Sequence, residues 1–454
     1  MSMRSINPAS GETIKEYDSW DDAHLDRVLQ SCSEIADAWA ETAIEERCQL
    51  MRKAAVVLRQ RRDELAGIIT QEMGKLIKES RAEIEKCASV CEYYADKGPG
   101  FLADEIIESD AGRSLVAYQP LGTVLAVMPW NFPFWQVFRF AVPALIAGNT
   151  GLLKHASNVP ACSQAIEEVF RQAGFPENVF RSLMIPASMV ARVIEDKRTH
   201  AVTLTGSEPA GIDVAQTAGK SLKKSLLELG GSDAFIVLED ADMHLTVSQA
   251  VLSRYMNSGQ SCIAAKRFIV LEEVADVFIG LFREAVAKLM PGDPMDEQTL
   301  LGPMARHELR DELHQQVLDT ISAGAEVLIG CAPEDNPGAY YQASILDYVK
   351  PGMRAYDEEL FGPVAIVIRA KDESEAIAIA NSSRFGLGGS VWTQDKKRGE
   401  RLARQLACGC AFVNGMVKSD PRLPFGGIKA SGYGRELSSH GIREFVNAKT
   451  IWIR

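Results

Sequence analysis

The sequence predicts an α/β fold. Short apolar runs that are typical of buried strands lie at 152–154, 201–205, 234–238 and 267–271. Between and around them, apolar residues recur every three or four positions, which is typical of helices. This helical periodicity covers 21–39, continues with breaks from 44 to about 97, and returns as an apolar stripe from Val274 to Leu289. Strands that alternate with helices in this way indicate parallel sheets covered by helices.

The composition is that of an ordinary globular protein. Hydrophobic residues make up 46% and charged residues 24% of the 454 positions. Asp and Glu number 61 against 49 Lys and Arg, a net charge of −12, so we expect neither nucleic acid nor anionic membranes as partners. The nine cysteines show no regular spacing and the first ten residues contain no apolar signal core, which indicates a reducing, cytoplasmic location.

Residues 113–138 contain the most apolar long stretch of the chain and begin with runs that are typical of strands. The stretch 124–138 is interrupted by prolines and polar residues, so we expect it to be buried in protein rather than in a membrane. Apolar runs at 113–119 and 123–128 flank a Pro120 to Gly122 turn, which predicts a hairpin or an extended arm. A domain junction is expected at Gly230-Gly231.

The chain lacks the GxGxxG turn of the usual dinucleotide-binding fold. Instead, the predicted strand 201–205 runs through Thr205-Gly206-Ser207 into a predicted helix, whose free backbone N–H groups could bind a pyrophosphate. By itself this pattern is also typical of a strand–helix connection that binds nothing.

Three residues could together perform covalent catalysis. Cys262 ends the small-residue segment Asn-Ser-Gly-Gln-Ser-Cys, Glu228 could serve as a base, and Asn131 could donate a hydrogen bond to an oxyanion. The alternatives are a structural cysteine, which is the commoner role, and an asparagine that forms a turn. No metal site is expected, because neither HExxH nor CxxC occurs, and no GxSxG motif indicates a serine hydrolase.

Motifs along nearly the whole chain resemble the aldehyde dehydrogenase family. They are PWNFP (129–133), Lys154 after a strand, TGS (205–207), LELGG (227–231), GQSC ending at Cys262, EELFGPV (358–364) and PFGGIKASGYGRE (424–436). Within the family, the pairing of PWNFPFWQ with LKHA and LELGGSD is most similar to the short bacterial succinate-semialdehyde dehydrogenases.

The resemblance implies two Rossmann-like α/β domains, one for the cofactor and one for catalysis, with a small β oligomerisation arm. The dinucleotide-binding domain would comprise 1–103 and 121–230, and the catalytic domain 231–430. The arm and C-terminal segment would comprise 104–120 and 431–454. A homodimer or homotetramer is therefore expected.

The resemblance also implies a mechanism. Cys262 would attack the aldehyde carbon, and the Asn131 amide with the Cys262 backbone N–H would hold the oxyanion. Hydride transfer to a nicotinamide would leave a thioester, and Glu228 would activate the water that hydrolyses it. Binding of NAD or NADP would fall to Met128, Pro129, Trp130, Lys154, Ser157, Thr205, Gly206, Ser207, Leu229, Glu359 and Phe361.

Ser157 bears on the choice of dinucleotide. Many NAD-dependent relatives have a glutamate at this place, three residues after the lysine. A carboxylate there would repel a 2′-phosphate, so the serine permits NADP without establishing a preference. Alternatively, Ser157 caps the next helix.

The expected substrate is succinate semialdehyde, with glutarate semialdehyde or another small aliphatic aldehyde as alternatives. In the similar enzymes an arginine at the place of Arg139 binds the distal carboxylate, assisted by a serine at the place of Ser419. A second family arginine is replaced by Met256, for which Arg254 could substitute. Phe140 replaces a lysine that pairs in some relatives with the glutamate matching Glu436, so we do not assign Glu436 to catalysis.

Two functions of other classes stay open on the sequence alone. A cofactor-free thiol esterase could use Cys262, Glu228 and Asn131 unchanged. A non-catalytic binding protein could reuse the fold, although it would not need to retain these three residues.

Overall fold

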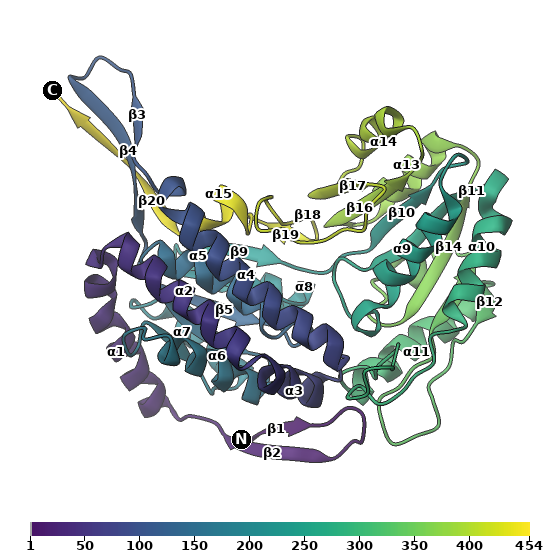
Figure 1. Ribbon diagram of the computed structural model, residues 1–454, viewed down its shortest axis with the longest axis horizontal. Coiled ribbons are helices and arrows are strands. Elements are labelled where there is room, and N and C mark those ends of the chain that lie inside the picture. The colour runs from purple at the N-terminus through teal and green to yellow at the C-terminus, as the bar shows by residue number, and fades with distance from the viewer. Residues whose placement is uncertain (1) are drawn as a thin grey trace.

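Two sheets of mainly parallel strands form the centre of the structure, a computed structural model that describes residues 2–454. Met1, the first residue of the predicted dinucleotide-binding range, lies outside the described residues. Helices flank both sheets, one unit lying to the left in Figure 1 and the other to the right. The α/β fold predicted from the alternation of strands and helices is therefore confirmed.

The first sheet has six strands in the order β19-β9-β8-β5-β6-β7. All neighbours are parallel except β19, which is antiparallel to β9. The strands are β5 (Thr123–Met128), β6 (Thr150–His155), β7 (Phe180–Ser182), β8 (Ala201–Thr205), β9 (Lys224–Glu228) and β19 (Gly432–Tyr433). The connecting helices are α5 (Trp135–Ile146), α6 (Pro160–Gln172), the 3-10 helix η1 (Ala187–Met189), α7 (Val190–Glu195) and α8 (Glu208–Lys220).

Each face of this sheet has its own apolar core, because successive strand residues point to opposite faces. On one face, Val124 and Leu153 pack with helices α2 to α6. On the other face, Leu125 and Leu152 pack with α1, α7 and α8. The N-terminal helices are α1 (Asp22–Glu41), α2 (Ile44–Gln60), α3 (Arg62–Met73) and α4 (Ile77–Phe101).

The second sheet has seven strands in the order β12-β13-β14-β11-β10-β16-β17, parallel except for β12 at the edge. They are β10 (Asp233–Val237), β11 (Ala265–Leu271), β12 (Glu326–Ile329), β13 (Ser344–Asp347), β14 (Val364–Ala370), β16 (Gly388–Trp392) and β17 (Cys410–Val413). The helices here are α9 (Met243–Tyr255), η2 (Met256–Gly259), α10 (Glu272–Val286), α11 (His307–Ser322), α12 (Arg354–Asp357), α13 (Glu373–Ser382) and α14 (Lys396–Ala403).

The chain joins the two sheets at two places. Residues 229–232 lead from β9 to β10. After β17 the chain returns through β18 (Ile428–Lys429), which pairs with β15 (Phe385–Gly386), and then enters the first sheet as β19. A short helix, α15 (Ser438–Ile442), follows. Loops from both sheets therefore meet between the two units.

A three-stranded arm projects from the first unit (Figure 1). It consists of β3 (Glu105–Ile107), β4 (Arg113–Pro120) and β20 (Val446–Ile453), and β20 pairs with β4 over its whole length. The N-terminal strands β1 (Ser2–Ile6) and β2 (Thr13–Asp18) form a separate hairpin.

Two expectations from the sequence are wrong. Residues 113–119 and 123–128 do not form a hairpin with each other, because β5 is buried on both faces and belongs in the parallel sheet, while β4 pairs with β3 and β20. Of the two alternatives for this segment, the extended arm is correct.

Ser157 does not cap the following helix, since α6 begins at Pro160 after Val159 and receives no side-chain cap.

The apolar stretch 124–138 forms β5, the loop after it and the start of α5, almost entirely buried within the protein. Across residues 2–454, none of the helices combines the length and the apolar character needed to cross a membrane.

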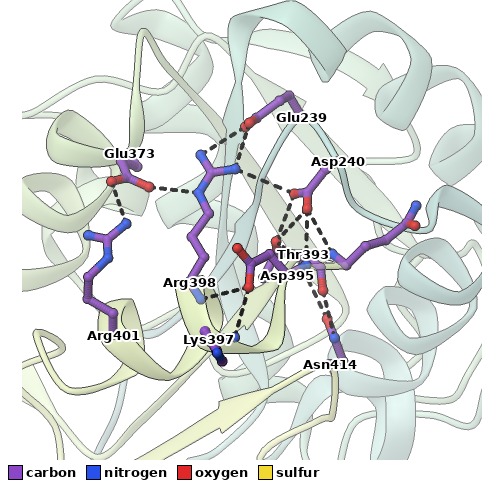
Figure 2. Close-up of polar contacts among 10 residues, drawn as sticks. Glu239, Asp240, Glu373, Thr393, Asp395, Lys397, Arg398, Arg401 and Asn414 are labelled. Carbon is purple, nitrogen blue, oxygen red and sulfur yellow. Dashed lines mark hydrogen bonds and ion pairs between the residues drawn. The ribbon is translucent and has the colours of Figure 1, made fainter.

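A polar network holds the end of β10 against helices α13 and α14 (Figure 2). The Arg398 guanidinium lies between Glu239, at 2.6 Å, and Glu373, at 2.9 Å. The Asp240 carboxylate accepts hydrogen bonds from the buried Thr393 hydroxyl at 2.7 Å and from the next backbone N–H at 3.0 Å. These bonds fix the loop between β16 and α14.

Replacing Asp240 by alanine should lower the free energy of unfolding by about 1–3 kcal/mol, because it leaves the buried Thr393 hydroxyl without its acceptor. Urea denaturation of the variant and of wild type measures this difference. Asp335→Ala, at an exposed loop position, is the matched control and should leave the midpoint unchanged. Equal midpoints for Asp240→Ala and wild type would contradict the expectation.

Candidate active site

A cleft of about 420 Å³ lies where strands β5, β8 and β9 end and where the loop before β11 approaches them. Ligands of α/β folds usually bind at the carboxyl ends of parallel strands. The cleft is lined by Pro129, Trp130, Asn131, Gln136, Thr205, Gly206, Ser207, Leu229, Gly230, Cys262, Arg306, Leu309, Glu312, Leu313, Gln316, Glu359 and Phe361. The structure thus brings Asn131 and Cys262 together in one wall.

The Asn131 side chain is fixed by contacts between the two units. Its Nδ2 donates to the Gln260 carbonyl at 3.0 Å, and its Oδ1 accepts from Gln136 Nε2 at 3.1 Å. The Asn257 amide donates to the backbone carbonyl of Asn131 at 2.8 Å. Because an amide nitrogen carries two hydrogens, one donor of Asn131 is left for a ligand.

The loop that carries Cys262 has an uncommon backbone. Asn257 and Ser258 both adopt left-handed dihedrals, with φ of 54°, which are unfavourable for residues with a side chain. Tertiary contacts hold them: Glu79 accepts from the Asn257 N–H at 3.0 Å, and the Ser258 hydroxyl donates to the Gly302 carbonyl at 2.8 Å. The position of Cys262 therefore depends on residues from distant parts of the chain.

The surroundings of Cys262 include a buried lysine. Lys266 Nζ donates to the carbonyls of Cys262, at 2.8 Å, and Ser261, at 2.9 Å, and pairs with Glu359 at 3.1 Å. Burial raises the pKa of the Cys262 thiol to about 12, and the charges of Lys266 and Arg139 oppose this rise. The Cys262 backbone N–H has no acceptor within residues 2–454, so it is available to an oxyanion.

Glu228 ends β9 behind the cleft wall and does not line the cleft. Its side chain is buried, and neither carboxylate oxygen has a hydrogen-bond partner in the described chain. Burial raises the pKa of Glu228 to about 8, while the Arg139 charge lowers it and Glu436 raises it. A Cβ at Gly426, which has φ of 153°, would lie 2.7 Å from Glu228 Oε1, so this glycine makes room for the carboxylate.

The two predicted substrate residues lie outside the cleft lining. Arg139 is buried, pairs through Nε with Glu436 and lies over the Phe425 ring at 4.8 Å. Ser419 Oγ accepts from Lys86 Nζ at 2.8 Å and from Trp135 Nε1 at 3.1 Å.

Arg254, considered as a substitute for the missing family arginine, does not reach a substrate. It is fully buried, and its guanidinium donates to the backbone carbonyls of Gly259, Leu360, Gly362 and Ala265.

The predicted dinucleotide-binding residues divide into three groups. Those in the cleft wall are Pro129, Trp130, Thr205, Gly206, Ser207, Leu229, Glu359 and Phe361. Ser157 lines a neighbouring cavity of about 390 Å³, which shares Arg306 with the cleft. Met128 and Lys154 are buried beneath the surface, and burial lowers the pKa of Lys154 to about 8.

The cleft fits a dinucleotide. Helix α8 begins at Glu208, and its N-cap Ser207 makes no side-chain capping bond, so the first N–H groups of the helix are free at the cleft wall. The Glu359 carboxylate accepts from the Gly231 N–H at 3.1 Å, which places a polar group against this wall. Within residues 2–454, no three His, Cys, Asp or Glu side chains gather closely enough to hold a metal ion.

Several residues of the site were not found from the sequence. Gln136, Asn257 and Gln260 lie inside recognised motifs or beside them. Gln136 contacts Asn131 from five residues away, whereas the contacts of Asn257 and Gln260 with Asn131 join segments more than 120 residues apart. The other unpredicted cleft residues are Gly230 and five residues from α11 and the position before it: Arg306, Leu309, Glu312, Leu313 and Gln316. No spacing or motif in 306–316 signals a cleft wall.

A cleft for a dinucleotide beside a fixed cysteine and an amide donor defines a class of protein: oxidoreductases that act through a covalent thiol intermediate. The sequence pattern of the aldehyde dehydrogenase family matches residues 1–451. The chain belongs to this family, as its motifs predicted.

The individual relatives are similar over their full length. The chain is 50% identical to a probable succinate-semialdehyde dehydrogenase (NADP(+)) of Synechocystis sp., covering 100% of both chains. It is 47% identical to a succinate semialdehyde dehydrogenase (NAD(P)+) of Escherichia coli, covering 99% of this chain and 97% of the other. The crystal structure of succinic semialdehyde dehydrogenase from Streptococcus pyogenes in complex with NADP+ has a TM-score of 0.98 and 39% identity, covering 99% of each chain.

If the reaction needs the ionised Glu228 carboxylate as base, its rate should increase as the pH rises. Since the pKa of Glu228 is raised to about 8, the group is mostly neutral below that pH and ionised above it. We expect kcat for aldehyde oxidation to rise through about pH 8 and then to level off. Steady-state rates between about pH 6 and 9 test this.

The matched variant for this profile is Glu228→Gln, which keeps the size of the side chain and cannot take up a proton. It should lower kcat by roughly 10²–10⁴-fold and remove the rise near pH 8. A profile that is flat through pH 8 in wild type, or unchanged in the variant, would show that Glu228 is not the base.

Proposed function

We propose that the protein oxidises succinate semialdehyde to succinate with NADP(+) as hydride acceptor, in the cytoplasm. The single observation that carries the oxidation is the position of Cys262 and Asn131 in the wall of a cleft that fits a dinucleotide. The named substrate is supported by the relatives, whose names specify succinate semialdehyde over the full length of the chain. All nine cysteines are free, which fits a reducing compartment.

In the proposed mechanism, Cys262 loses its thiol proton to water, the thiolate Sγ forms a bond to the aldehyde carbon, and the carbonyl oxygen becomes an oxyanion. The free N–H of the Asn131 amide and the Cys262 backbone N–H donate to this oxygen, which stabilises the tetrahedral intermediate. Lys266 holds the Ser261 carbonyl, which shares a peptide plane with the Cys262 N–H, so this N–H stays fixed as the charge develops. A bound NADP(+) supplies the acceptor for the hydride that leaves the aldehyde carbon.

The thioester that results must be hydrolysed. Glu228 would take a proton from water, whose oxygen attacks the thioester carbon and displaces the Cys262 thiolate, giving the carboxylic acid. The carboxylate lies behind the wall in this structure, but neither of its oxygens is hydrogen-bonded in the described chain. Turning it toward Cys262 therefore breaks no hydrogen bond.

The residues that would hold the dinucleotide are those predicted from the motifs. The N-terminus of α8 at Ser207 suits the pyrophosphate, and Glu359 with Phe361 suits the nicotinamide ribose. Lys154 and Ser157 would meet the adenosine ribose, and the absence of a carboxylate at 157 supports NADP(+).

The direct test of the substrate is a comparison of succinate semialdehyde with uncharged butanal, each with NADP(+) and with NAD(+). We expect kcat/KM for the semialdehyde to exceed that for butanal by roughly tenfold to 150-fold, the value of one charge-assisted hydrogen bond. Formation of reduced nicotinamide measures all four rates. Equal kcat/KM for the two aldehydes would overturn the substrate, and ester hydrolysis without dinucleotide, together with failed binding of NAD(+) and NADP(+), would indicate a thiol esterase.

Ser157→Glu should reverse the preference for the dinucleotide. A carboxylate at this exposed position would repel the 2′-phosphate, and we expect kcat/KM for NADP(+) to fall by about tenfold or more while that for NAD(+) changes little. Ser157→Gln, of the same size and without charge, is the control. If both variants lose NADP(+) activity equally, the effect is one of size and the argument from charge fails.

We propose further that the arm joins copies of the chain into a homodimer or homotetramer. The apolar side chains of Ile106, Ile107, Trp452 and Ile453 are exposed on the arm, between 47% and 63% of their full areas. These side chains lie on both faces of the arm, because successive strand residues point to opposite sides, and exposed apolar side chains of this kind are typical of an interface. Ile106→Lys with Ile107→Lys should shift the mass in multi-angle light scattering to that of the monomer, and a wild type that is already monomeric at micromolar concentration would refute the assembly.

A further inference from the structure

Lys266, on strand β11, carries an ammonium group that contacts two separate segments of the site. The residue is 1% exposed and is not among those that line the cleft. Its Nζ donates to the backbone carbonyls of Ser261 and Cys262 at 2.9 and 2.8 Å, and it pairs with the Glu359 carboxylate at 3.1 Å. These three contacts match in number the three hydrogens of an ammonium group. Lys266 therefore spends its donors on the nucleophile loop and on one wall of the cleft.

The Glu359 carboxylate divides its two oxygens between the protein and the cleft. Oε1 accepts from the Gly231 N–H at 3.1 Å and pairs with Lys266. Oε2 has no hydrogen-bond partner within residues 2–454, and it lies so close to Gly230 in the cleft wall that a Cβ there would overlap it. The side chain is 18% exposed, so Oε2 is left to accept a hydrogen bond from a ligand.

Gly231 joins the carboxylate to the nucleophile from the other side. Its N–H donates to Glu359, and a Cβ at this position would lie 2.6 Å from the carbonyl oxygen of Cys262. Only a glycine can therefore approach the nucleophile loop so closely. Cys262, Lys266, Glu359 and Gly231 thus form one closed group where the chain passes from the first sheet to the second.

One further carboxylate faces Lys266. Burial raises the pKa of Asp233 to about 7, and the Lys266 charge opposes this rise. Asp233 Oδ1 accepts from the Gly388 N–H at 3.0 Å, and within residues 2–454 no ion pair joins Asp233 to Lys266. Glu359 is therefore the carboxylate that Lys266 holds.

Four charged groups act on the Cys262 thiol. Burial raises the pKa of the thiol to about 12, and the positive charges of Lys266 and Arg139 oppose this rise. The negative charges of Glu359 and Glu228 add to it. Lys266 and Glu359 therefore act on the thiol with opposite signs while they hold each other in place.

We propose that Lys266 is a positioning residue, which holds the loop that carries Cys262 and the Glu359 carboxylate as one unit. This role rests on the proposed function in one respect, the contact of Glu359 with the nicotinamide ribose. Lys266 touches neither substrate nor dinucleotide itself. Because small displacements of reacting groups strongly lower rates, a shared support for the nucleophile and for the dinucleotide ligand keeps their separation constant.

The first test measures the Kd of NADP(+) by titration calorimetry, without aldehyde, in wild type, Lys266→Met, Glu359→Gln and the double variant. We expect each single change to raise Kd by about tenfold or more, the value of one charge-assisted hydrogen bond. Since the two residues act as a unit, the double variant should lose about tenfold as well, and not the product of about 100-fold. Lys288→Met, at an exposed position, is the control and should bind as wild type.

The second test needs neither dinucleotide nor turnover. It follows the alkylation of Cys262 by iodoacetamide between about pH 7 and 9, and peptide mass spectrometry separates this cysteine from the eight others. Lys266→Met should slow the alkylation by about tenfold, because it removes a charge that favours the thiolate. Glu359→Gln should accelerate it by about threefold, because it removes a charge that disfavours the thiolate.

Opposite signs separate positioning by charge from a loss of structure. A Lys266→Met variant that unfolds would expose all nine cysteines to rapid alkylation. In that case Lys266→Arg, which keeps the charge, and Glu359→Gln, at the cleft surface, carry the test. Lys266→Arg should retain an alkylation rate within about threefold of wild type.

The outcomes also separate this role from the proposed function. Additive effects on Kd, or alkylation that changes in the same direction in Lys266→Met and Glu359→Gln, would overturn the role of Lys266 and leave the proposed function standing. If wild type binds neither NADP(+) nor NAD(+), the proposed function fails. The alkylation rates then still decide whether Lys266 and Glu359 act together on Cys262.

Discussion

The hydrogen bonds between the loop after β5 and the loop before β11 are the constraint on which the site depends. Asn131 donates to the Gln260 carbonyl, and Asn257 donates to the Asn131 carbonyl, so each loop holds the other. One loop belongs to the first sheet and carries Asn131, the proposed oxyanion donor, while the other belongs to the second sheet and carries Cys262. Donors that are fixed before the reaction cost no reorganisation when charge develops, which is how such sites gain most of their effect.

Side chains of helix α4 form hydrogen bonds with both loops. Glu79 accepts from the Asn257 N–H, and Glu83 accepts from the N–H groups of Phe134 and Trp135. Lys75 neutralises Glu83 in a fully buried pair. Breaking a buried pair of this kind is strongly destabilising, so these residues hold the active-site loops in one arrangement.

Much of the fold and of the candidate site could be predicted from the sequence, because local patterns and motifs encode them. Periodicity gave the alternation of strands and helices, and motifs placed Cys262, Asn131 and most residues of the cleft wall. The hairpin expectation failed because it depended on distant partners: the strand 123–128 resembles half of a hairpin until its burial on both faces is known. The start of α6, by contrast, is marked locally by Pro160, since proline favours the first position of a helix.

Long-range polar pairing was equally hidden. Arg139 pairs with a carboxylate almost 300 residues later in the chain, and Lys86 meets Ser419 across 333 positions. A motif shows that an arginine is present, but whether its charge is free or compensated depends on tertiary structure.

The central claim is that Cys262 forms a covalent acyl intermediate that Glu228 helps to hydrolyse. The most direct measurement is intact-protein and peptide mass spectrometry of Glu228→Gln after mixing with succinate semialdehyde and NADP(+). We predict that one succinyl group accumulates on Cys262 in this variant and is absent from Cys262→Ala. Turnover by wild type with no acyl group on the trapped variant, or an acyl group on another cysteine, would contradict the account.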